Sequence, residues 1–286
     1  MRRIFIGSVA AVLAANGLAS CAAVPAQQKV TLNIAATDSF RPILQQLAES
    51  YHSRQTWVDL ELHTANTARL EQDFKDGAAY DLYITGSHAS LVALASKDAV
   101  NPRSLLILAY NQLVMVSAQD SSLRLDYHVM ATSDVRQIAV ASPDLMLGYL
   151  TREALTNMHY LPKHEAQPLV GENGAAAAPS LLSPLDQATN LEPKLLVVNS
   201  EDEVIAAVKD GRAQVGITYS SFAFADKTVR ILQALQDSQN GQVPYQPIEY
   251  DVGIPRNAPH NDEAWNFLNY LRSAEAHAIM QRDGLL

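Results

Sequence analysis

The chain has 286 residues, of which 48% are hydrophobic and 18% are charged, and its formal net charge is −9. This composition is typical of a globular protein long enough to form two lobes, and it excludes a largely disordered chain. An acidic chain with no basic run is also a poor candidate for nucleic-acid binding. Any anion site must therefore act through local amides and hydroxyls and not through the overall field of the protein.

The first residues are expected to be a processing signal and not part of the fold. Arg2 and Arg3 give a basic start, and residues 4–18 form an apolar run that is short for a membrane span. We interpret residues 1–20 as a lipoprotein signal peptide.

The sequence Leu18-Ala19-Ser20-Cys21 is similar to the bacterial lipoprotein box, in which the cysteine is lipidated and becomes the first mature residue. Cys21 is the only cysteine of the chain, so it cannot form an internal disulfide. We therefore predict a lipid anchor at Cys21, followed by a tether at residues 21–28. The alternative is a secretory peptide that is cut later, for instance after Ala26.

The segment 29–51 predicts a strand, a short loop and a helix. Val30, Leu32 and Ile34 alternate with polar residues, and apolar residues then recur at helical spacing from Phe40 onward. Between them, Asp38 or Ser39 is expected to cap the helix. A hydroxyl at the start of a helix suits an anion, because the free amides point outward there. The alternative is an ordinary capped helix.

The same strand-then-helix pattern continues through the chain. Further strands are expected at residues 58–62, 81–85, 105–110, 113–117, 138–140, 195–198, 214–219 and 250–254, with helices between them and two helices at the end. Such alternation predicts an α/β fold, with mostly parallel sheets covered by helices on both faces. Residues 160–191 interrupt the pattern with prolines, glycines and an alanine run, and we interpret them as a surface insertion.

Taken together, these segments resemble the periplasmic molybdate-binding proteins of ABC importers, which are type II solute-binding proteins with a ligand cleft between two lobes. The segments that carry the resemblance are Thr31 to Leu44, Thr64 to Thr67, Gly77 to Ile84, Ser142 to Leu155 and Glu192 to Tyr219. The resemblance implies one lobe from residues 29–115 plus 250–286 and a second from residues 116–249. The strand-then-helix pattern on both sides of residues 113–118 and 250–254 also predicts that ligand binding closes the lobes about a hinge there.

The resemblance also implies a ligand site made of neutral donors. Ser39, Thr67 and Tyr219 would each offer a hydroxyl, while Leu147 and Glu201 would each offer a backbone N–H. Such donors can hold a tetrahedral oxyanion without a countercharge. The implied ligand is molybdate or tungstate, with no cofactor and no bound metal ion.

Two features depart from the family pattern. The family usually has small apolar residues where this chain has Thr37 and Asp38. A carboxylate about 5 Å from a dianion would repel it by several kcal/mol at an effective dielectric near 20, so Asp38 is a possible modulator of the site. The loop before Leu147 is also one residue shorter than usual and lacks its proline.

The sequence gives no positive sign of catalysis. It has no G-x-S-x-G, no phosphate-loop glycine pattern and no zinc-type Cys/His spacing. We therefore expect a monomeric, membrane-anchored lipoprotein of the periplasm or cell surface that passes an oxyanion to an ABC transporter permease. The alternatives are a binding protein for another small anion or polar solute, a small-ester hydrolase, and a sensor lipoprotein that takes no part in transport.

Overall fold

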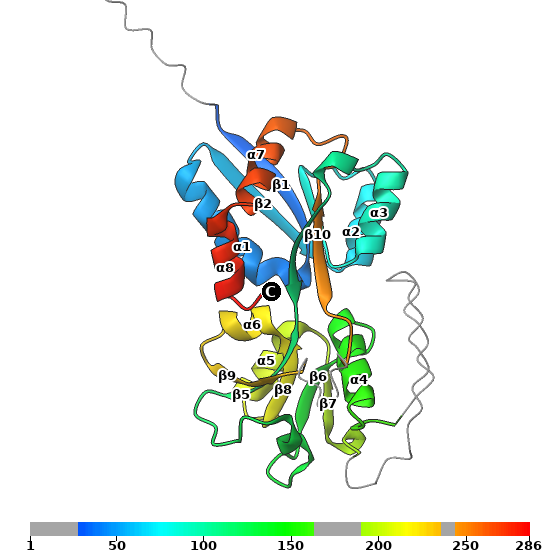
Figure 1. Cartoon of the computed structure of the whole chain (residues 1–286), viewed down its shortest axis with the longest axis vertical. Coiled ribbons are helices and arrows are strands. Elements are labelled where there is room, and N and C mark those ends of the chain that lie inside the picture. The colour runs from blue at the N-terminus through cyan, green and yellow to red at the C-terminus, as the bar shows by residue number, and fades with distance from the viewer. Residues whose placement is uncertain (1–27, 163–189, 236–243) are drawn as a thin grey trace, which may run out of the picture.

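The computed structural model describes residues 28–162, 190–235 and 244–286, which form two α/β lobes stacked one above the other (Figure 1). Lobe 1 is built on a sheet of order β2-β1-β3-β10-β4, and lobe 2 on a sheet of order β7-β6-β8-β5-β9. The strands of lobe 1 are β1 (Val30–Thr37), β2 (Val58–Ala65), β3 (Leu82–Thr85), β4 (Leu106–Asn111) and β10 (Ile248–Gly253). Those of lobe 2 are β5 (Leu113–Ala118), β6 (Ile138–Ala141), β7 (Leu195–Val198), β8 (Val215–Tyr219) and β9 (Val229–Ala234).

The two sheets share one arrangement of strand directions. In lobe 1, β2, β1 and β3 are parallel, and β10 runs antiparallel to both β3 and β4. In lobe 2, β7, β6 and β8 are parallel, and β5 runs antiparallel to both β8 and β9. In each sheet, the fourth strand in the order is the only one that runs in the direction opposite to the others. The expected fold, with two α/β lobes and mostly parallel sheets, is therefore confirmed.

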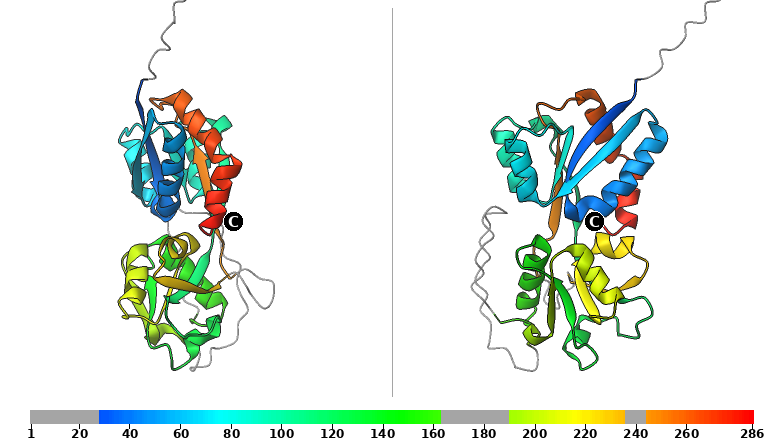
Figure 2. Two further views of the ribbon diagram at one scale, coloured as in Figure 1. Left: turned by 90° about the vertical axis from the view of Figure 1, so that its left-hand side faces the viewer. Right: turned by 180° about the vertical axis from the view of Figure 1, so that it is seen from behind.

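Helices cover both faces of the lobe 1 sheet. One face carries α1 (Arg41–Arg54), α7 (Asn261–Leu271) and α8 (Ala274–Arg282), and the other carries α2 (Thr67–Lys75) and α3 (His88–Ser96) (Figure 2). In α1, Ile43, Leu44, Leu47 and Tyr51 lie on one buried stripe. Burying each such side chain contributes roughly 1.5–3 kcal/mol, so this stripe fixes α1 against the sheet.

In lobe 2 the helices are α4 (Met146–Asn157), α5 (Glu201–Lys209) and α6 (Ser220–Ala225). The start of α4 packs closely against the end of β6. A Cβ atom added to Gly148 would lie 2.0 Å from the carbonyl oxygen of Ser142 and 2.4 Å from that of Ala141. Only glycine allows this approach, and it holds the first turn of α4 beside the loop that follows β6.

The chain passes between the lobes at Gln112, which separates β4 from β5. Strand β5 (Leu113–Ala118) pairs only with β8 and β9, which are strands of the lobe 2 sheet. The boundary expected between residues 115 and 116 thus falls within a strand of lobe 2. Sheet pairing also begins again in lobe 1 at Ile248, two residues before the expected return at 250.

Several expectations fall outside the described residues. These are the signal peptide, the anchor at Cys21, nearly all of the tether, and residues 163–189 of the insertion. In the part of the chain that the structure describes, no helix combines the length and apolar character needed to cross a membrane.

Candidate functional site

The junction between the lobes contains residues that the sequence proposed for the site. Ser39 lies in a short 3-10 turn, η1 (Asp38–Phe40), between β1 and α1, and it is buried. Its carbonyl oxygen accepts a hydrogen bond from the Ser221 hydroxyl of lobe 2 at 3.2 Å. Its side chain is hydrogen-bonded to the hydroxyl of Tyr250. Ser39 therefore touches both lobes.

The expectation that Asp38 or Ser39 caps α1 is wrong. Helix α1 begins at Arg41, its N-cap is Phe40, and no side chain caps it by a hydrogen bond. The 3-10 turn at residues 38–40 shifts the start of the helix past both residues. The Ser39 hydroxyl is thus engaged with Tyr250 and not with the amides of α1.

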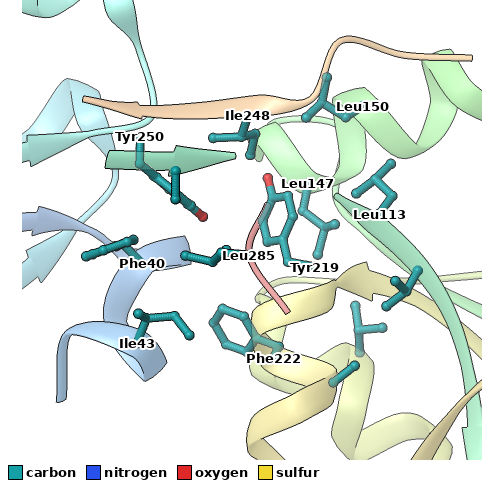
Figure 3. Packing of buried hydrophobic residues seen from close by; sticks show 14 of the residues in the cluster. Phe40, Ile43, Leu113, Leu147, Leu150, Tyr219, Phe222, Ile248, Tyr250 and Leu285 are labelled. Atoms are coloured by element: carbon teal, nitrogen blue, oxygen red, sulfur yellow. The ribbon is translucent and has the colours of Figure 1, made fainter. Parts of the chain in front are cut away.

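Tyr219 and Tyr250 approach the junction from opposite lobes. Tyr219 ends β8 and precedes α6, and its side chain is buried. Tyr250 lies on β10, where its hydroxyl accepts a hydrogen bond from the Asn111 side chain at 2.8 Å and its ring packs 4.8 Å from that of Phe40. Figure 3 shows both tyrosine hydroxyls pointing into the buried junction. Burial raises the pKa of Tyr250 well above its ordinary value, so this hydroxyl stays protonated.

The other three expected residues all lie at the starts of helices. Thr67 is the first residue of α2, where Asn66 is the cap and accepts a hydrogen bond from the Arg69 amide at 2.8 Å. Leu147 is the second residue of α4, whose N-terminus has no side-chain cap. Glu201 is the first residue of α5. The first amides of a helix lack partners within the helix, so these positions can donate to an anion.

Asp38 faces lobe 2. It hydrogen-bonds to the side chain of Thr64, and burial raises the pKa of its carboxyl, with a further increase from the charge of Asp202. Burial likewise raises the pKa of Glu201, and the negative charge of Asp38 adds to that shift. Two carboxyls from opposite lobes therefore lie close enough to repel each other, and both hold protons more tightly than an ordinary carboxyl.

Sequence reasoning missed the polar groups that join the lobes. Arg41 in α1 forms an ion pair with Asp202 in α5, and its guanidinium lies 5.6 Å from the centre of the Phe222 ring. Asn111 donates a hydrogen bond to Ser221 at 2.9 Å, and its side-chain oxygen accepts one from Ser220 at 2.8 Å. Such residues carry no motif, because their importance comes from the contact between lobes.

Two cavities are lined by residues other than those expected for the site. One, of about 300 Å³, lies beside the Arg41–Asp202 ion pair and reaches Phe222 and Lys209. A larger one, of about 840 Å³, lies wholly in lobe 2 between residues 118–134 and 208–214. Neither is lined by Ser39, Thr67, Leu147, Glu201 or Tyr219.

Two α/β lobes that meet at a buried polar junction, joined by strands that run from one lobe to the other, are the architecture of a solute-binding protein. The chain belongs to the family described as bacterial extracellular solute-binding protein, whose family model matches residues 32–286.

Among its relatives is a putative ABC transporter substrate-binding lipoprotein, YvgL, of Bacillus subtilis. It is 22% identical over 98% of this chain and 96% of its own length. The molybdate-binding protein ModA of Escherichia coli is 24% identical over 90% of this chain and 88% of its own length. The sequence resemblance to molybdate-binding proteins is therefore confirmed.

Solved structures show the same fold. The substrate-binding domain of a putative molybdenum ABC transporter from Clostridium difficile superposes with a TM-score of 0.68 at 24% identity, over 90% of this chain and 98% of that one. The periplasmic molybdate-binding protein of Azotobacter vinelandii gives a TM-score of 0.65 at 18% identity, over 89% and 98%.

Proposed function

We propose that the protein captures a small oxyanion, molybdate or tungstate, between its lobes and delivers it to the permease of an ABC importer. The observation that carries this proposal is that Ser39 of lobe 1 and Tyr219 of lobe 2 are both buried, and that the Ser39 carbonyl oxygen accepts a hydrogen bond from Ser221, two residues after Tyr219. A ligand held from both sides favours the closed arrangement of the lobes, because it contacts both only when they meet.

The proposed ligand set is Ser39, Thr67 and Tyr219 through their hydroxyls, with Leu147 and Glu201 through their backbone N–H groups. The start of α4 supports the role of Leu147, because no side chain caps the free amides of the first turn of α4. Neutral donors at helix starts suit a tetrahedral oxyanion, and they disfavour a ligand that lacks an acceptor at each position.

The carboxyls of Asp38 and Glu201 would repel a bound dianion if both were ionised. Both carboxyls have raised pKa values because of burial. A bound dianion would raise them further, so we propose that the oxyanion binds together with proton uptake by this pair. A protonated carboxyl carries no charge, so it no longer repels the dianion.

The names of relatives support the choice of ligand. ModA proteins of two species are named for molybdate, at 24% and 23% identity. Another small anion remains the alternative within the same class, because structures that share the fold include a sulfate-binding protein of Mycobacterium tuberculosis at 15% identity and a TM-score of 0.59.

We further propose the membrane attachment and partner that were expected from the sequence: a lipid at Cys21, a monomeric chain outside the cytoplasm, and a membrane permease. The relative from Bacillus subtilis is named a lipoprotein, which supports the anchor. A small-ester hydrolase is disfavoured, because the Ser39 hydroxyl is paired with Tyr250, and a tyrosine with a raised pKa is a poor general base.

A thermal-shift panel on the mature chain tests the proposal. Molybdate, tungstate, sulfate, phosphate and thiosulfate are compared at equal concentration and ionic strength. A true ligand at a hundred times its dissociation constant should stabilise the fold by about 2.7 kcal/mol. We expect molybdate and tungstate to raise the melting temperature most. A shift with sulfate or phosphate alone would move the assignment to another anion, and no shift with any oxyanion would contradict it.

A further inference from the structure

We propose that His88, Glu249 and Asp251 form a binding site for a divalent transition-metal ion, with Zn²⁺ as the natural probe. One nitrogen of the histidine and one oxygen of each carboxylate all lie within 4.8 Å of one another. The site lies in lobe 1 and is independent of the oxyanion proposal.

The elements of lobe 1 place these side chains together. His88 is the first residue of α3, three residues after the end of β3, while Glu249 and Asp251 lie two apart on β10, which pairs with β3. Tyr250 stands between them and packs on Phe40 at the junction. Since successive side chains of a strand point to opposite faces, Glu249 and Asp251 face α3, on the side of the sheet opposite to α1.

The spacing of the ligand atoms fits a small metal ion. His88 Nδ1 lies 3.1 Å from Asp251 Oδ2 and 3.3 Å from Glu249 Oε1. Zinc bonds of about 2.0–2.1 Å in tetrahedral geometry put neighbouring ligand atoms roughly 3.3–3.4 Å apart. The two distances therefore need to change by only a few tenths of an ångström, and the fourth position would be left to water.

The charges also favour a cation. The Asp251 side chain is 3% exposed, and Glu249 lies beside it. Within the described ranges, His88 is the only basic side chain within 4.0 Å of either carboxylate. Even a protonated His88 leaves one negative charge uncompensated, and buried charges are normally paired or bound to metals.

The hydrogen bond that holds one of the carboxylates and the exposure of the histidine to solvent also favour a metal ion at this site. The Tyr110 hydroxyl donates a hydrogen bond to Glu249, which fixes that carboxylate from outside. The His88 side chain is 62% exposed, so an ion reaches the cluster directly from solvent. Imidazole with two carboxylates is a ligand set for Zn²⁺ and its neighbours, and it differs from the all-oxygen sets that Mg²⁺ and Ca²⁺ prefer.

Calorimetric titration of Zn²⁺ into the chelator-treated mature chain tests the site. We expect one ion per chain, with affinity reduced at least about tenfold in both His88→Ala and Glu249→Gln. The control is His63→Ala, which removes another lobe 1 histidine that lies 3.7 Å from a single carboxylate, that of Glu61. This control should bind Zn²⁺ as the wild type does.

Co²⁺ provides a second readout, because a tetrahedral site gives visible absorption bands that a merely surface-bound ion does not. The bands should be present in wild type and His63→Ala and lost in His88→Ala. Circular dichroism checks folding, which should hold because His88 is on the surface. Absence of a stoichiometric ion in the wild type, or equal binding in wild type, His88→Ala and Glu249→Gln, would overturn the proposal.

Discussion

Arg41 of lobe 1 lies with its Nη2 atom 2.5 Å from the Oδ2 atom of Asp202 in lobe 2. The pair joins the first turn of α1 to the first turn of α5, and both turns adjoin expected site residues, Ser39 and Glu201. It is partly open to solvent, with the two side chains 35% and 65% exposed. An exposed pair contributes little to folding, so its main effect should be on the contact between lobes.

We predict that Arg41→Gln weakens oxyanion binding but changes the free energy of unfolding by no more than about 1 kcal/mol. The change removes a cation near the ligand and one link that holds the lobes together. Calorimetry with molybdate and urea unfolding measure the two effects. Arg54→Gln is the control, because Arg54 pairs with Glu275 inside lobe 1. Equal affinities for Arg41→Gln and Arg54→Gln would show that the inter-lobe pair has no part in binding.

Gly148→Ala should damage both stability and binding. The new methyl group would overlap the carbonyl oxygens of Ser142 and Ala141, and overpacking of this kind typically costs about 1–3 kcal/mol. Relief of the clash moves the first turn of α4, which carries the Leu147 amide.

Gly77→Ala is the matched control for that change. Gly77 has φ of +89° but nothing within 4 Å of an added Cβ, so the cost comes from backbone strain alone, at roughly 1 kcal/mol. Its binding of molybdate should be normal once the protein is folded. Normal molybdate affinity in folded Gly148→Ala would argue against a role for Leu147.

The affinity for molybdate should fall as the pH rises above the ordinary pKa range of carboxyl groups, about 3.9 to 4.3. Asp38 and Glu201 already have raised pKa values, and a dianion beside them raises these further. The complex then binds more protons than the free protein, so by linkage binding weakens as protons become scarce. Asp38→Asn should flatten the profile, whereas Asp262→Asn, an exposed change at the start of α7, should not. A profile that is identical in wild type and Asp38→Asn would contradict the proton-uptake account.

The fold could be predicted largely from local patterns. Alternation of apolar and polar residues predicts β1, and the two helices predicted at the end of the chain are α7 and α8. The sequence does not predict the strand β9, because the burial of Val229–Ala234 follows no clear period of two. Alternation of buried and exposed residues is the signal by which a strand is recognised in a sequence.

The site was harder to predict than the fold. Sequence order could suggest Ser39 and Tyr219, but it could not show that Asp38 and Glu201 lie close enough to interact, because a 3-10 turn places Asp38. Nor could it find Asn111, whose side chain links Tyr250 with Ser221 only after the lobes have met. Contacts of this kind depend on residues more than a hundred positions apart, and no local pattern encodes them.

The most direct test of the account is calorimetric titration of molybdate into the wild type, Ser39→Ala, Thr67→Val, Tyr219→Phe and Asp38→Ala. Each of the first three variants leaves an oxyanion oxygen without a donor, so each should lose about 1–3 kcal/mol of binding free energy. Asp38→Ala removes a nearby negative charge and should bind as well as the wild type or more tightly. Tyr110→Phe, a change on the lobe 1 surface, should leave binding unchanged. Loss of molybdate binding in Asp38→Ala alone, with folding intact by circular dichroism, would contradict the oxyanion assignment.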